Sequence, residues 1–129
     1  MKTAFISGHR DITEAEFNRH YVPLLDEALA ANHHFVVGDY HGADIMAQRH
    51  LKEKGATAVV YHMFAAPRNH AGFPTRGAFT SDESRDAAMT LASDYDIAWL
   101  RPGKDQSGTA QNLRRRTQLA KAAFKITLD

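Results

Sequence analysis

Short apolar runs alternate with helix-like patterns along the whole chain, and this alternation limits the folds open to it. Each run is continuous and rich in β-branched or aromatic residues, as in strands that are covered on both faces. Helical segments between such strands act as right-handed crossovers, which leave the strands parallel and put helices on both faces of the sheet. The sequence therefore predicts one doubly wound α/β domain with a five-stranded, mostly parallel sheet. The predicted strands are residues 4–7, 34–37, 58–63, 96–100 and 124–128.

Size and charge exclude several classes of function. A chain of 129 residues, 43% hydrophobic and 24% charged, can build a single core without disulfides, and it has no cysteine to form them. A net charge of +1 argues against general affinity for nucleic acid or for an anionic membrane surface. No apolar run approaches the ~18 residues of a membrane span, and the first residues resemble a strand rather than a signal peptide. We therefore expect a cytoplasmic protein that does not associate with membranes.

Helix boundaries can be placed from capping residues. Thr13 and Glu16 have the spacing of a capping box, and Pro23 predicts a break near Tyr21 in the helix that follows. A second helix is expected over residues 43–54, with Gly55 at its C-cap.

The remaining two helices are expected at about residues 81–93 and 109–122. Thr80 and Glu83 have capping-box spacing at the start of the first of these. Residues 64–80 have no clear period. A loop this long in a small domain is more often functional than not, although a mobile surface loop is the alternative.

Glycines and hydrogen-bonding residues follow several of the predicted strands. In an open parallel sheet, ligands bind beyond the carboxyl ends of the strands, where the strand order reverses. A glycine-rich turn that enters a helix offers unpaired N–H groups at the positive end of the helix dipole, which suits a phosphate. The sequence thus predicts a site for a nucleotide-like ligand. The candidate ligand-binding residues at this edge are Ser7, Gly8, Arg10, Gly38, Asp39, Gly42, Asp44, Ser107, Gly108 and Thr109. The resemblance described below adds Asn112.

Several of these residues, and Arg85 of the following helix, also have a purely structural explanation. Gly8 and Gly38 can be explained by a need for positive φ at a strand end. Asp39 and Asp44 can serve as helix N-caps. Arg85 can be a solvated helix residue, in an ion pair with the acid three positions earlier. The functional interpretation depends on their occurrence together at one edge of the sheet.

Four motifs in this order resemble the SLOG superfamily of Rossmann-like nucleotide-binding domains, which includes the Lonely-Guy phosphoribohydrolases. SGHR at 7–10 resembles the first-strand turn of its bacterial branch, and GDYHGADIMA at 38–47 resembles its second-strand signature. RDAAM at 85–89 matches the R-x-x-x-M helix motif. PG at 102–103 followed by SGT at 107–109 is similar to the P-G-G-x-G-T phosphate loop, with an insertion. The resemblance covers nearly the whole chain.

The resemblance implies a cleft for a nucleoside 5′-monophosphate or a larger nucleotide derivative. Backbone amides of residues 107–109 would bind phosphate together with the Thr109 hydroxyl. Gly8 and Gly38 would let the backbone approach the ligand, and Arg85 would contact its phosphate or sugar. No cofactor and no metal are expected in this interpretation.

Asn112 departs from the pattern of the phosphoribohydrolases, in which G-T-x-x-E supplies a glutamate that acts at the ribose C1′. An amide can hydrogen-bond a ribose hydroxyl but cannot serve as a general base. Hydrolysis would then need Glu83, Asp39 or Asp44, and Glu83 and Arg85 are the candidate catalytic residues. Two functions stay open: a nucleotide sensor, and an N-glycosidase that hydrolyses nucleoside 5′-monophosphates.

Two other classes of function compete with nucleotide binding. His9, His41 and His62 each follow or end a predicted strand, and with Asp39 they suggest a metal-dependent hydrolase. Arg114–Arg116 resembles a nucleic-acid patch, but three consecutive residues point to different sides of a helix, so we expect a solvated surface instead.

Related domains commonly self-associate through helices that flank the sheet. Phe73 and Phe79 are expected to be exposed in the long loop, where they could cover a neighbour or close over a ligand. We therefore expect a homo-oligomer.

Overall fold

The computed structural model describes residues 1–128, and side chains through residue 122. Five parallel strands form one sheet in the order β4-β3-β2-β1-β5. The strands are β1 (Thr3–Ser7), β2 (His34–Gly38), β3 (Ala58–Met63), β4 (Thr75–Phe79) and β5 (Tyr95–Ala98). The helices are α1 (Glu14–His20), α2 (Val22–Ala30), α3 (Ala43–Glu53), α4 (Asp82–Leu91) and α5 (Gly108–Leu128).

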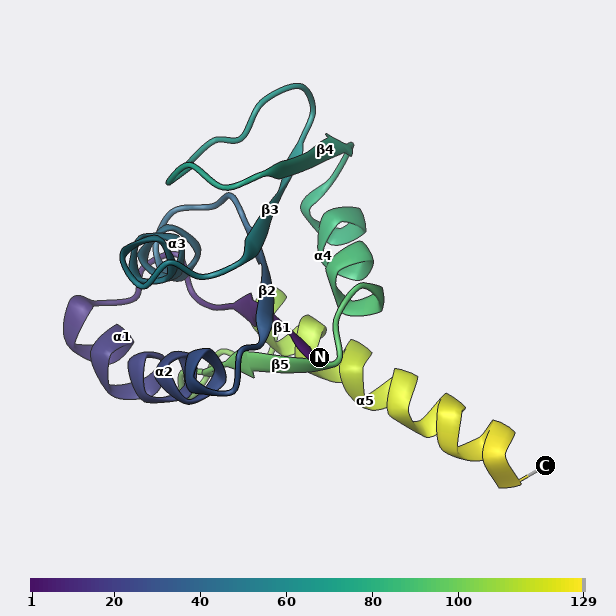
Figure 1. Ribbon diagram of the computed structural model, residues 1–129. Coiled ribbons are helices and arrows are strands. Elements are labelled where there is room, and N and C mark those ends of the chain that lie inside the picture. Colours follow the sequence, from purple (N-terminus) through teal and green to yellow (C-terminus); the bar gives the residue numbers. More distant parts are fainter. Residues whose placement is uncertain (129) are drawn as a thin grey trace.

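The helices form a layer on each face of the sheet. Helices α1, α2 and α3 cover one face, α4 and α5 lie on the other, and the C-terminal part of α5 projects beyond the body of the domain (Figure 1). From β1 the strands proceed outward to β4 on one side, whereas β5 lies on the other side of β1. The strand order therefore reverses at β1. The predicted doubly wound α/β fold is confirmed.

One predicted strand is wrong, and one strand was not predicted. Residues 124–128 belong to α5, because neither glycine nor proline interrupts the chain after Gly108 and the helix continues through them. The fifth strand is β4, which lies within the predicted loop 64–80 and is mostly exposed. Its sequence has little strand propensity, so pairing with β3 decides its structure.

The capping residues predicted from the sequence are correct for α1 and wrong for α4. Thr13 and Glu16 form the predicted capping box. Helix α4 is capped by the hydroxyl of Ser81, which accepts from the Ser84 amide, so the capping box predicted at Thr80 is wrong.

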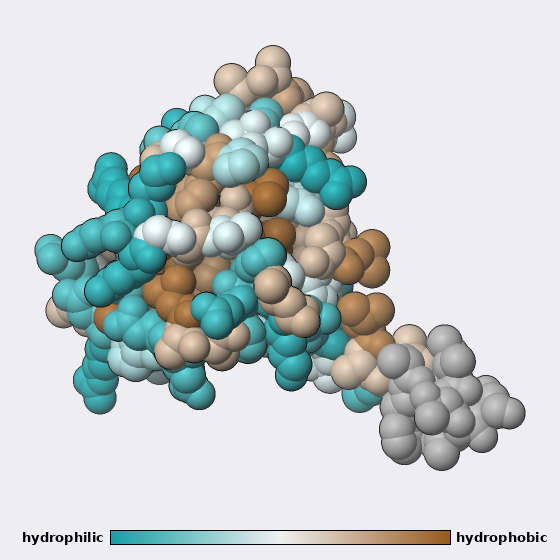
Figure 2. Space-filling view, in the orientation of Figure 1, coloured by the Kyte–Doolittle hydropathy of each residue, from teal (hydrophilic) through white to brown (hydrophobic). Residues whose placement is uncertain are grey.

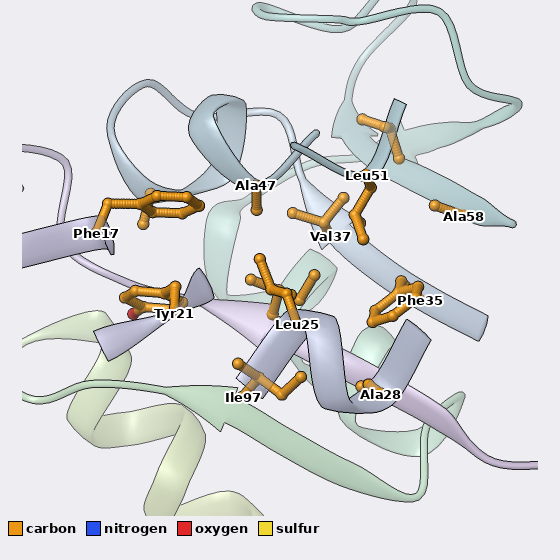
Figure 3. Close-up of a cluster of buried hydrophobic side chains, with 14 of the residues drawn as sticks. Phe17, Tyr21, Leu25, Ala28, Phe35, Val37, Ala47, Leu51, Ala58 and Ile97 are labelled. Atoms are coloured by element: carbon orange, nitrogen blue, oxygen red, sulfur yellow. The ribbon is translucent and has the colours of Figure 1, made fainter. Parts of the chain in front are cut away.

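The larger core lies between the sheet and helices α1, α2 and α3. Figure 3 shows Leu25 at its centre, with the stacked rings of Phe17 and Tyr21 on one side and Phe35 on the other. Tyr21 occupies the break between α1 and α2 that Pro23 predicted. Its buried hydroxyl donates to the carbonyl of Ser7 at 2.6 Å and accepts from the amide of Trp99 at 3.0 Å. Tyr21 thus joins the carboxyl ends of β1 and β5.

The second core is smaller and lies on the α4 side of the sheet. It consists of Phe5, Val36, Tyr61 and Met89. Hydrophilic residues cover much of the molecular face in Figure 2, with hydrophobic patches between them.

The long loop after β3 is held in place by hydrogen bonds and by a buried ring. The backbone amide of Arg68 donates to Asp39 at 2.8 Å, and Gln48 of α3 bonds the backbone of Asn69 and Ala71. Phe73 is buried in the larger core, so its predicted exposure is wrong. These contacts argue against the mobile-loop alternative.

Candidate functional site

A cavity of about 360 Å³ lies at the carboxyl edge of the sheet, where β1, β2 and the loop after β5 meet. This is the edge at which ligands bind in open parallel sheets, and the volume lies within the usual range for small-molecule sites. It brings together most of the residues predicted from the sequence. Those that line it are Ser7, Gly8, Arg10, Gly38, Asp44, Arg85, Ser107, Gly108, Thr109 and Asn112.

Three predicted site residues do not line the cavity. Asp39 is fully buried beneath two arginines, and Gly42 is the N-cap of α3, where it packs against the backbone of Arg10. Glu83 is exposed on α4, while Asp82 and Asp86 of the same helix line the cavity. Glu83 is therefore poorly placed for the catalytic role that the sequence suggested.

The N-terminus of α5 forms one end of the cavity. The hydroxyl of Ser107 accepts from the amide of Ala110 at 3.2 Å and caps the helix. Among the described residues, the amides of Gly108 and Thr109 have no hydrogen-bond acceptor. These amides lie at the positive end of the helix dipole, which is a favourable position for an anion.

Other polar groups around the cavity also lack partners. Arg10 and Lys104 line it, and neither forms an ion pair with another described residue. Ser7 is 6% exposed, and its hydroxyl has no hydrogen-bond partner. A buried hydroxyl without a partner costs free energy, but this oxygen is enclosed, so a ligand can bond it only if the cavity wall shifts.

Arg85 is the centre of a buried network of charges. Its guanidinium contacts Asp39 at 2.7 Å and Asp86 at 2.8 Å, and it lies 3.1 Å from Asp82. Only 5% of Arg85 is exposed, so the alternative of a solvated helix residue is wrong. Burial alone would raise the pKa of Asp39, but hydrogen bonds from Arg68 and the charge of Arg85 outweigh it and lower that pKa.

Gly38 lets two charged side chains approach the end of β2. A Cβ atom here would lie 2.5 Å from Oδ2 of Asp44 and 3.0 Å from Cζ of Arg85. Neither Gly38 nor Gly8 has a positive φ, so the conformational explanation offered for them is wrong. At Gly8, a Cβ would collide with Tyr21 and with the first residue of α3. Close approach explains both glycines.

Asp44 reaches the cavity from the first turn of α3. One carboxyl oxygen accepts from the amide of Tyr40 at 3.2 Å, and the side chain does not cap α3. The N-cap alternative is therefore wrong for Asp44. Burial raises the pKa of Asp44 to about 7, against the opposing charge of Arg85 and with help from Asp86.

Asn112 is buried at the cavity wall, and only 2% of it is exposed. Its amide nitrogen donates to Asp86 at 3.2 Å, and its oxygen accepts from Arg115 at 2.7 Å. Both ends of the side chain are thus already hydrogen-bonded. This arrangement suits a positioning role in the wall of the cavity.

The three histidines of the metal-site alternative do not come together. His9 and His41 line the cavity, whereas His62 does not. Nε2 of His9 accepts from the amide of Arg101 at 2.9 Å, and burial together with the charge of Arg101 lowers the pKa of His9. Within the described residues, no three side chains of metal-binding type are grouped so that they could hold an ion.

The basic run of α5 is bound largely to the protein itself. Arg116 pairs with Asp96 at 3.1 Å and donates to the carbonyl of Ser93 at 3.0 Å. Arg115 bonds Asn112, and Arg114 donates to the backbone of Asp105. Arg116 is largely covered by these contacts, so the expectation of a solvated surface is wrong for it, whereas Arg114 is exposed as expected.

Sequence reasoning missed several residues of the cavity wall. Asp86 and Met89 lie within the RDAAM motif, but only the helix phase shows that they face the cavity. Tyr40 and Lys104 also line it. A signal was present for both, because each lies in a loop that directly follows a predicted strand.

Comparison of the chain with protein-family models, curated proteins and solved structures finds no match. The resemblance to the SLOG superfamily therefore stays a prediction, carried by the four motifs. In the part of the chain that the structure describes, no helix is both long and apolar enough to cross a membrane.

Proposed function

We propose that this protein binds a nucleotide or a nucleotide-derived phosphate ester in the cavity, with the phosphate at the N-terminus of α5. The observation that carries the proposal is the set of unpartnered groups there. The amides of Gly108 and Thr109 lack acceptors among the described residues, and both residues line the same cavity. Arg10 and Lys104 add positive charge beside them. Hydrogen-bond donors and cations around one cavity favour an anionic ligand.

A sensor or binding module is the form of this function that the residues favour. Breaking an N-glycosidic bond needs a group that can move a proton or stabilise positive charge at C1′. Asn112 can do neither. Of the three carboxyl groups that could replace a glutamate, Glu83 and Asp39 do not line the cavity, so cleavage would depend on Asp44 alone. Self-association is a separate proposal, which analytical ultracentrifugation tests directly.

Gly108 offers a sharp test, because it is the first residue of α5 and follows the capping Ser107. Proline is well tolerated at this helix position but lacks an N–H, so Gly108→Pro removes one donor and leaves the helix intact. Gly108→Ala is the matched control, since it keeps the N–H and a Cβ there meets nothing within 4 Å.

Binding of adenosine 5′-monophosphate and of inorganic phosphate is measured by isothermal titration calorimetry. We expect Gly108→Pro to weaken binding about tenfold, as for the loss of one charge-assisted hydrogen bond, and Gly108→Ala to leave it unchanged. Equal affinities for the two variants, or no binding by the wild type at millimolar ligand, would refute the proposal. Assay of free adenine in the same samples tests glycosidic cleavage.

A further inference from the structure

Four carboxyl groups line the cavity, and Asp44 differs from the other three. Asp11 pairs with Arg101 at 2.9 Å, Asp82 with Arg68 at 2.7 Å, and Asp86 with Arg85 at 2.8 Å. Asp44 has no ion pair among the described residues. Asp44 is 7% exposed and is the most deeply buried of the four. The most buried carboxyl group of the cavity is thus the one without a cation.

The hydrogen bonding of Asp44 is equally sparse. Its Oδ2 accepts the single bond from the Tyr40 amide at 3.2 Å, and no described donor reaches Oδ1. Although Oδ1 has no partner, it is not enclosed by protein atoms. Because Asp44 lines the cavity, this oxygen has the cavity as its open side. A ligand in the cavity can therefore reach it.

The surroundings of Asp44 disfavour a negative charge there. From α4, Asp86 opposes ionisation and Arg85 favours it, and at the end of β2 Asp39 opposes it. Tyr21, at the junction of α1 and α2, faces Asp44 as a neutral phenol whose pKa burial raises to about 12. The turn after β1 brings His9, Arg10 and Asp11 to the same cavity, and His41 follows β2. Burial outweighs the charge of Arg85, and the carboxyl titrates near neutral pH with a pKa of about 7.

An anionic ligand strengthens this preference for the neutral form. A phosphate at the N-terminus of α5 adds negative charge to the cavity that Asp44 faces, and a like charge nearby favours the protonated carboxyl. A protonated carboxyl donates one hydrogen bond, whereas a carboxylate only accepts. The group of the ligand beside Asp44 must then be an acceptor.

We propose that Asp44 recognises the ligand as a neutral carboxyl that donates a hydrogen bond to an acceptor oxygen or nitrogen, so that binding takes up a proton. This inference rests on the proposed function and specifies it further. The ligand is a phosphate ester whose remaining part presents an acceptor, not an ammonium group, to the first turn of α3. Binding is tighter at mildly acidic pH than at alkaline pH.

The test is calorimetric titration of adenosine 5′-monophosphate at pH 6.0, 7.0 and 8.5, with wild type, Asp44→Asn and Glu53→Gln. Asparagine has the shape of the carboxyl and keeps an N–H donor at every pH. Glu53 is exposed at the far end of the same helix and is the control for loss of one negative charge. Ionisation of the ligand phosphate is common to the three proteins, so the comparison isolates the titration of Asp44.

We expect Asp44→Asn to bind like wild type at pH 6.0 and about tenfold more tightly than wild type at pH 8.5, with Glu53→Gln following wild type throughout. Titration of wild type in two buffers of different ionisation enthalpy is expected to show uptake of up to one proton at pH 8. This second measurement needs no variant.

Binding without proton uptake would overturn the inference and leave the proposed function standing. So would an Asp44→Asn variant that binds at least tenfold more weakly at pH 6.0, because the carboxylate would then be an acceptor for a ligand amine. Absence of binding by wild type at every pH would instead refute the proposed function, and the inference with it.

Discussion

Replacing Asp44 with asparagine is expected to change the free energy of unfolding in a way that depends on pH. The pKa of Asp44 is about 7 in the folded protein, against an ordinary value of 3.8. The folded state therefore binds more protons than the unfolded state between these two values, and stability falls as pH rises through this window. At about 1.36 kcal/mol per pH unit, the interval corresponds to at most about 4 kcal/mol.

Asparagine resembles the protonated carboxyl and never ionises. We expect Asp44→Asn to match wild type near pH 4 and to exceed it by about 2–4 kcal/mol above pH 7. The difference should grow steadily between pH 4 and 7 and then stay constant.

Urea denaturation followed by far-UV circular dichroism at pH 4, 5, 6, 7 and 8.5 measures this difference. Glu53→Gln serves again as the exposed control, and its effect should not follow the same window. A stability difference that does not change with pH, or an Asp44→Asn variant less stable than wild type at pH 8.5, would refute the reasoning. Either result would mean that Asp44 is ionised and well solvated or well paired in the folded protein.

Substitutions at three other positions, two of them with a comparison variant, test the structure around the cavity. Arg85→Ala leaves buried carboxylates without their cation and should cost about 3–5 kcal/mol in urea denaturation, with Arg85→Lys less damaging; a loss below 1 kcal/mol would contradict this network. Gly38→Ala places a Cβ 2.5 Å from Asp44, and should lower both stability and affinity for adenosine 5′-monophosphate. Gly55→Ala, at a φ of +69° with open space around it, should cost only about 1 kcal/mol of backbone strain and leave affinity unchanged, so equal effects of the two glycine variants would argue against close approach at Gly38. Tyr21→Phe removes a hydroxyl bound to two buried backbone groups and should lower thermal stability by about 2 kcal/mol, whereas an unchanged melting temperature would contradict that role.

The fold was predictable where local pattern and tertiary packing agree. Four of the predicted apolar runs are strands because they are covered by helices on both faces, which demands continuous apolar sequence. Strand β4 does not need a continuous apolar sequence, since it lies at the edge of the sheet and is mostly exposed. Its structure is set by pairing with β3. The β-branched and aromatic residues of 124–128 favoured a strand, but an uninterrupted helix continues through them.

The site was predictable where backbone chemistry decides it. Glycines at strand ends and at the start of α5 follow from the need for close approach and free amides, which the sequence expresses directly. The choice among acidic residues was not predictable, because it depends on helix phase. Arg85 and Met89 fix the buried side of α4, and Asp82 and Asp86 lie beside that side while Glu83 faces solvent. The raised pKa of Asp44 could not be predicted either, because it results from burial in the folded protein and not from neighbouring residues in the sequence.

The position of β1 in the sheet has a consequence for the order in which the cavity is built. Strand β1 pairs with β2 and with β5, and the wall of the cavity combines residues 5–11 with residues 104–112. During synthesis, a chain that has emerged only as far as β4 can pair β1 to β4 in sequence order, but it lacks the N-terminus of α5, where we propose that the phosphate binds. Closing the site requires a contact between the two ends of the chain, which is slow relative to local structure. Under the proposed function, ligand binding would report completion of the whole domain, and a fragment ending before β5 should bind no nucleotide even if its strands are paired.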